Sequence, residues 1–79
     1  MIPEELQDIL VSTPDTLSGS VRFKGTRVPL QALLDTPTEG DGIDDFLQSW
    51  PDVTREQAVA VVMWEQDQAR KQFGLELVA

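Results

Sequence analysis

The sequence contains neither cysteine nor histidine. Without cysteine the chain cannot form disulfides or thiolate metal sites, and without histidine it lacks the commonest metal ligand and general base of proteins. The neighbouring acids Asp41, Asp44 and Asp45 do not have the spacing of a calcium-binding EF-hand loop. We therefore expect a protein that is not an enzyme and that uses no metal and no cofactor.

Basic residues are scarce as well: 6 Lys and Arg stand against 14 Asp and Glu, which gives a net charge of -8 at pH 7. Such a chain is poorly suited to non-specific binding of nucleic acid or anionic lipid, because phosphate binding depends on clustered Lys and Arg. Half of the cations nevertheless lie close together, as Arg22, Lys24 and Arg27, whereas acids crowd residues 35–56. These opposite poles could pair between subunits, or both could simply be solvated.

The chain also lacks any apolar stretch of membrane-spanning length, and its first residues do not form a secretory signal peptide. We expect a cytoplasmic protein that does not bind membranes. Its 79 residues allow one domain, 1–79. A domain of this size buries only about 60% of the surface that its unfolded chain exposes, so oligomerisation would supply useful additional core.

The apolar pattern predicts a mainly α fold that begins with a strand pair. Pro3 favours a short helical turn, after which strands near residues 9–12 and 21–24 can pair as an antiparallel hairpin. Residues 13–20 have the composition of turns, with Leu17 directed inward.

Helices are expected in the remainder of the chain. Pro29 is expected to be the first residue of a helix that ends near Asp35 and carries Leu30, Leu33 and Leu34 on one side. Residues 36–42 are expected to form a linker. The next stretch has apolar residues at helical spacing as far as Pro51, at Ile43, Phe46, Leu47 and Trp50.

The strongest helix signal is the Thr54-Arg55-Glu56-Gln57 segment, which has the residues of a capping box. It predicts a long helix over residues 55–72, with Gly74 as its terminating residue and 74–79 as a flexible tail. Seven consecutive apolar residues, 58–64, lie in this helix and spread around its axis. One side can pack on the core, and the rest needs a second protein surface. We therefore expect a homo-oligomer, most simply a dimer, with an interface built from Val59, Val62, Met63 and Trp64.

Two motifs carry a family resemblance. Phe23-Lys24-Gly25-Thr26-Arg27-Val28-Pro29 and, further along, Trp50-Pro51-Asp52-Val53-Thr54-Arg55-Glu56-Gln57 resemble the domain-of-unknown-function 433 family, over about residues 9–68. The resemblance implies a three-helix, helix-turn-helix (homeodomain-like) core with N-terminal strands. It also implies an antitoxin that is paired with a PIN-like nuclease toxin.

The chain departs from the family pattern in two places. Gly19-Ser20-Val21 stands where the family usually has Gly-Lys-Pro, so the hairpin is less well defined. Thr36-Pro37-Thr38 replaces an apolar continuation of the first helix, which should therefore end a turn early.

The first motif allows two interpretations. In the structural one, Gly25 supplies an unusual backbone angle and Thr26 bonds to the backbone of the following turn. In the functional one, Arg27 binds a carboxylate or phosphate of a partner together with Arg22 and Lys24, and an acidic protein surface is favoured over DNA. The residues assigned to this motif are Arg22, Lys24, Gly25, Thr26, Arg27 and Pro29.

Three functions remain open at this point. The leading one is an antitoxin-like protein that neutralises a PIN-like nuclease toxin. The second is a helix-turn-helix transcriptional regulator that could bind DNA in complex with its toxin partner. In this function Thr54, Arg55 and Gln57 would contact the major groove. Nearby acids disfavour DNA binding by the chain alone. The third is a structural oligomer without a toxin.

Overall fold

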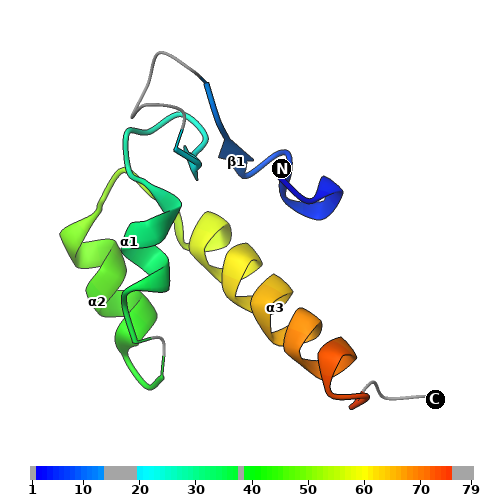
Figure 1. Cartoon of the computed structure of the whole chain (residues 1–79). Coiled ribbons are helices and arrows are strands. Elements are labelled where there is room, and N and C mark those ends of the chain that lie inside the picture. Colours follow the sequence, from blue (N-terminus) through cyan, green and yellow to red (C-terminus); the bar gives the residue numbers. More distant parts are fainter. Residues whose placement is uncertain (1, 14–19, 38, 76–79) are drawn as a thin grey trace.

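The computed structural model of the chain describes residues 2–13, 20–37 and 39–75. It is mainly α, with a small sheet near the N-terminus, as expected. The elements in chain order are the 3-10 helix η1 (Glu4–Leu6), strands β1 (Leu10–Val11) and β2 (Arg22–Phe23), and helices α1 (Leu30–Leu34), α2 (Gly42–Ser49) and α3 (Arg55–Gln72). Figure 1 shows the strands at one end of the molecule and the C-terminal end of α3 at the other. Leu17, much of the expected turn region and the last residues of the expected tail lie outside the described residues.

The sheet is antiparallel, with Leu10 opposite Phe23 and Val11 opposite Arg22. The other edge of β2 is also paired, because the Phe23 N–H donates to the Val28 carbonyl at 3.0 Å and Arg22 forms a bridge with Pro29. Pro29 is therefore extended, with φ -70° and ψ 146°. The expectation that Pro29 is the first helical residue was wrong by one position, since α1 begins at Leu30.

The expected linker ends at a glycine whose backbone lies against the backbone of Pro37. Gly42, the first residue of α2, is buried, and a Cβ placed there would collide with the Pro37 carbonyl. α1 ends at Leu34, in keeping with the early end that was predicted. Because Gly42 already belongs to α2, the linker is one residue shorter than the sequence indicated.

Helix α3 has the predicted bounds and is capped at both ends. The Thr54 side chain accepts from the Gln57 N–H while the Gln57 side chain accepts from the Thr54 N–H, which completes the capping box. At the C-terminal end the Gly74 N–H donates to Lys71 and the Leu75 N–H to Arg70, the hydrogen bonds of a Schellman motif. The caps satisfy backbone groups that the helix itself leaves without partners.

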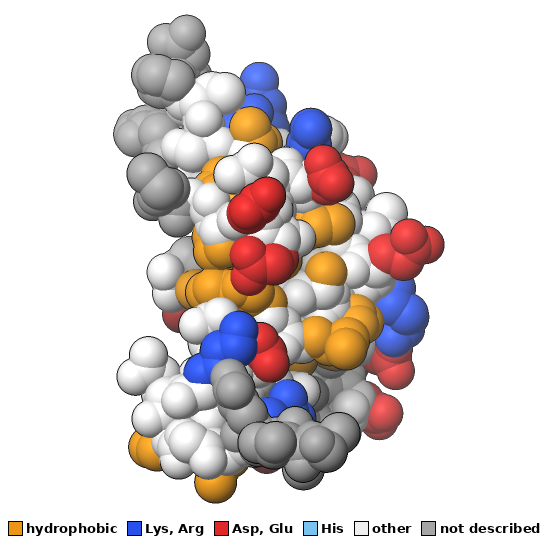
Figure 2. Space-filling view, turned by 90° about the vertical axis from the view of Figure 1, so that its right-hand side faces the viewer, with side chains coloured by type: hydrophobic (Ala, Val, Ile, Leu, Met, Phe, Trp, Pro, Cys, Tyr) orange, Lys and Arg blue, Asp and Glu red, His pale blue; other side chains and the backbone are white. Residues whose placement is uncertain are grey.

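One apolar cluster joins the N-terminal segment, the sheet and the helices. Phe23 and Phe46 meet at its centre, with ring centroids 6.1 Å apart and planes tilted by 52°. The buried members are Leu6, Leu10, Phe23, Val28, Leu33, Phe46, Val53, Ala58, Val61 and Val62. Outside this core, Figure 2 shows apolar side chains that reach the surface between acidic ones.

Candidate partner-binding surface

The turn between β2 and Pro29 is held by its own side chains. The Thr26 hydroxyl donates to the Phe23 carbonyl at 2.9 Å and accepts from the Val28 N–H at 3.0 Å. Gly25 has a φ of 80°, a left-handed angle that glycine adopts without the steric cost of a Cβ. Both observations agree with the structural interpretation of this motif.

Arg22 holds the same turn from the strand side. Its Nε donates to the Thr26 carbonyl at 3.0 Å and its Nη1 donates to the Thr13 hydroxyl at 3.1 Å. The guanidinium is thereby engaged within the chain. Arg22 thus contributes to the shape of the turn, whereas the sequence had suggested it as a group that contacts a partner.

Helix α3 adds a further support. The Gln57 Nε2 donates to the Lys24 carbonyl at 3.1 Å, while its Oε1 accepts from the Thr54 N–H at 3.0 Å. One side chain therefore caps α3 and ties the turn to it. The turn is fixed from both of its flanks, which keeps low the entropy cost of binding a partner there.

Two cations of the turn are left for other contacts. The side chains of Lys24 and Arg27 are exposed, and neither makes a hydrogen bond or ion pair within the described part of the chain. Arg27 is thus a motif residue whose guanidinium has no polar partner among residues 2–13, 20–37 and 39–75. A guanidinium on a fixed turn is suited to bind a carboxylate in bidentate geometry.

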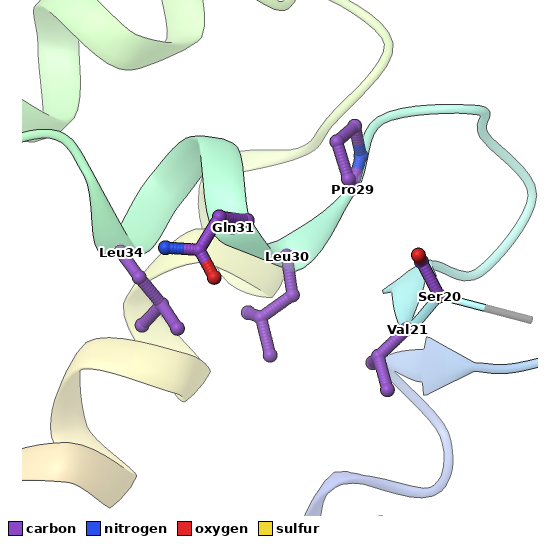
Figure 3. Close-up of a pocket in the computed structure, with 6 residues that line it drawn as sticks. All are labelled: Ser20, Val21, Pro29, Leu30, Gln31 and Leu34. Atoms are coloured by element: carbon purple, nitrogen blue, oxygen red, sulfur yellow. The ribbon is translucent and has the colours of Figure 1, made fainter. Parts of the chain in front are cut away.

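An apolar groove begins next to this turn. A hollow of about 330 Å³ is lined by Pro29, Val21, Leu30 and Leu34. A second hollow, of about 300 Å³, is also lined by Val21, Leu30 and Leu34 and extends from them to Leu6 and Trp64. Because the two hollows share Val21, Leu30 and Leu34, we describe them as one feature, the leucine groove. Figure 3 shows Leu30 and Leu34 projecting from α1 toward the space beside Val21.

The leucine groove was not predicted from the sequence. Leu30, Leu33 and Leu34 were expected together on one side of their helix, but Leu33 is buried while Leu34 stays 45% exposed. Five residues make barely more than one turn, so neighbouring leucines point in different directions. The signal was present, because Leu33 and Leu34 are adjacent and lie about 100° apart on a helix.

The four residues of the expected subunit interface on α3 differ in their surroundings within the chain. Val62 is only 9% exposed, and Trp64 packs against the core with its Nε1–H donating to Glu5 at 3.1 Å. The reason is that the N-terminal segment lies along α3, where Ile2, Pro3 and Leu6 share a hollow with Val61 and Trp64. Met63 remains outside, 63% exposed, and Val59 is half-buried.

The residues suggested for DNA contact are engaged within the chain. Thr54 and Gln57 hold the start of α3, and the Arg55 guanidinium pairs with Asp44. A base-reading side chain needs its donors and acceptors available in the groove. These side chains would have to give up their present partners to contact a base.

The described residues contain no group of three or more acids that is close enough to hold a metal ion. Within the same residues, none of the helices is both long and apolar enough to span a bilayer.

Residues 10–64 match the protein family described as a protein of unknown function, DUF433. The chain belongs to this family. The region of the chain that matches DUF433 includes the whole turn, β1, β2, α1, α2 and the part of α3 up to Trp64. The residues that fix the turn on both flanks, Thr13, Arg22 and Gln57, thus lie within the DUF433 region.

A curated relative is "Uncharacterized protein y4eO" of Sinorhizobium fredii (strain NBRC 101917 / NGR234). It is 32% identical over 50 residues, which cover 63% of this chain and 23% of the relative. The match therefore spans less than a quarter of that protein. No solved structure matches the chain at a significant level.

Proposed function

We propose that this DUF433 chain is a non-enzymatic, antitoxin-like protein of the cytoplasm that binds a PIN-like nuclease toxin and holds it inactive. The observation that carries the proposal is the leucine groove beside a fixed turn whose Arg27 side chain has no polar partner among the described residues. The nature of the partner comes from the family resemblance.

The two parts of this surface suit different parts of a protein partner. An open apolar groove can accept apolar side chains of a partner's helix or extended segment. Glu65 lines the groove and Glu5 is bonded to Trp64 of its lining, so basic residues beside that segment would be favoured. Arg27 would bind a carboxylate elsewhere on the same partner.

Sequence-specific DNA binding is the alternative function, with α2 and α3 as its helix-turn-helix. It has less support, because Thr54, Arg55 and Gln57 have partners within the chain and the net charge is -8. A basic partner subunit would be needed to offset the repulsion of phosphates. Binding to promoter DNA is therefore expected to require the toxin.

The proposal predicts a gene for a PIN-like nuclease beside the gene of this chain. The test is co-purification of the tagged chain with that nuclease, followed by a measurement of the cleavage activity of the nuclease. We expect a stoichiometric complex without cleavage activity. Arg27→Ala and Leu34→Glu should each weaken binding by about tenfold or more, because each removes or reverses a central contact.

Matched controls are Lys71→Ala and Leu75→Glu, which alter a cation and an exposed leucine outside the turn and the groove. They should bind the nuclease like the unaltered chain, and circular dichroism should show every variant folded. Failure to bind the nuclease, or equal binding by Arg27→Ala and Leu34→Glu, would contradict the proposal. A shift of promoter DNA by the chain alone would favour the alternative function.

A further inference from the structure

Helix α3 has an outward face that residues 2–13, 20–37 and 39–75 leave uncovered. The side of this helix that packs in the core carries Ala58, Val61 and Val62. On the opposite side Glu56, Met63 and Arg70 follow one another at intervals of seven residues. Seven residues turn a helix by about 700°, which is within about 20° of two full turns. These three side chains therefore lie in one line along the helix.

The two charged members of this line are available for a partner. The side chains of Glu56 and Arg70 are exposed and make no hydrogen bond or ion pair with the described residues. Their neighbours differ, because Arg55 pairs with Asp44 and Lys71 pairs with Asp67 at 3.1 Å. Met63, between them, is 63% exposed, and half-buried Val59 lies one turn before it.

The order acid, apolar residue, base is complementary to itself when it is reversed. If a second copy of α3 lies antiparallel across a two-fold axis at Met63, the Met63 side chains of both copies meet. Glu56 then faces Arg70 of the partner subunit, and Arg70 faces Glu56 of the partner subunit. A closed two-fold dimer uses one surface patch twice, which is the arrangement that this line of residues permits.

We propose that two copies of this chain associate through an antiparallel pairing of α3, with Met63 at the two-fold axis and a Glu56–Arg70 ion pair on each side. The antiparallel arrangement also sets the dipoles of the two helices in opposite directions, which is favourable. A parallel pairing would place Glu56 against Glu56 and Arg70 against Arg70, and like charges would repel.

The pairing leaves the leucine groove and Arg27 outside the contact, because it uses the face of α3 opposite the core. It is independent of the proposed toxin. Only one helix of each copy takes part, so we expect a small interface and a dissociation constant in the micromolar range or weaker.

The experiment is sedimentation equilibrium of the full chain over a wide concentration range at low salt. The unaltered chain should pass from 8.8 kDa to twice that mass as its concentration rises. Met63→Asp should stay monomeric. Arg70→Glu should weaken the dimer by about tenfold or more, since it turns two attractions into two repulsions.

The decisive variant reverses both charges. Glu56→Arg combined with Arg70→Glu restores opposite charges across the axis, so dimerisation should return to within about threefold of the unaltered chain. Arg27→Glu makes the same change of net charge as Arg70→Glu alone, but on the distant turn, and serves as the control for that variant. It should dimerise like the unaltered chain, and circular dichroism should show the same helix content in all variants.

Three results would overturn the proposal. The first is a chain that stays monomeric at every concentration. The second is a dimer that Met63→Asp leaves intact, which would show that another surface is used. The third is a double charge reversal that dimerises no better than Arg70→Glu.

Discussion

Thr26 is the residue on which the turn before Pro29 depends most. Its hydroxyl is at once the donor to the Phe23 carbonyl and the acceptor for the Val28 N–H. Val28 is buried, so water has little access to that N–H if the hydroxyl is lost. A buried donor without a partner costs about 1–3 kcal/mol.

Thr26→Val keeps the shape of the side chain and removes the hydroxyl. We expect the free energy of unfolding in urea to fall by about 1–3 kcal/mol. Thr36→Val is the matched control, because that hydroxyl donates to the Ala32 carbonyl and accepts from no backbone N–H in the described part of the chain. Its effect should stay below about 1 kcal/mol. Equal losses in the two variants would mean that the Thr26 hydroxyl has no special role.

Part of this residue-scale picture could be predicted from the sequence. The roles of Gly25 and Thr26 follow from local chemistry, since their partners are within three residues. The role of Arg22 does not, because Thr13 lies nine residues away across the hairpin and only folding brings them together. The lack of a partner for Arg27 among the described residues becomes meaningful only when the partners of the other cations are known.

Among the elements, α3 is joined to the turn by the side chain of Gln57. Two hydrogen bonds of this side chain can be separated by mutation. A glutamate at this position can still accept from the Thr54 N–H, but it cannot donate to the Lys24 carbonyl.

Gln57→Glu should therefore leave the helix content of α3 unchanged while hydrogen exchange in the turn around Gly25 becomes faster. The loss of stability should be at most about 1 kcal/mol, because the Lys24 carbonyl can bond to water instead. Gln57→Ala is the comparison, since it also removes the cap and should lower the helix content. Unchanged exchange in Gln57→Glu would show that the bond to Lys24 does not restrain the turn.

The bounds of α3 were predictable because caps are local signals: Thr54 with Gln57 begins the helix, and Gly74 follows its end. The surroundings of α3 could not be predicted from the sequence. The apolar run predicted that Trp64 needed another protein, yet a segment more than fifty residues earlier supplies Glu5 as its partner. Sequence periodicity gives the direction of a side chain, and packing decides which segment covers it.

For the whole molecule, the net charge of -8 dominates the electrostatics. The ion pairs Arg55–Asp44 and Lys71–Asp67 are exposed, and pairs of this kind contribute little. Repulsion among the remaining acids opposes the compact state, and salt screens it.

Raising sodium chloride from about 20 to about 200 mM should therefore increase the free energy of unfolding, by about 0.5–1 kcal/mol. Urea is the suitable denaturant because it is uncharged, and tryptophan fluorescence can report unfolding at a fixed, low protein concentration. A decrease in stability with added salt would show that attractive pairs outweigh the net repulsion.

The contact of Gly42 with the Pro37 backbone has a consequence for engineering this protein. A library that alters the partner surface should leave residue 42 fixed, because even a methyl group there would force α2 away from the preceding segment. Glu39 and Asp41 are exposed and can be randomised. Residues 39 and 41 of the stretch between α1 and α2 therefore tolerate diversity, whereas residue 42, with which α2 begins, does not.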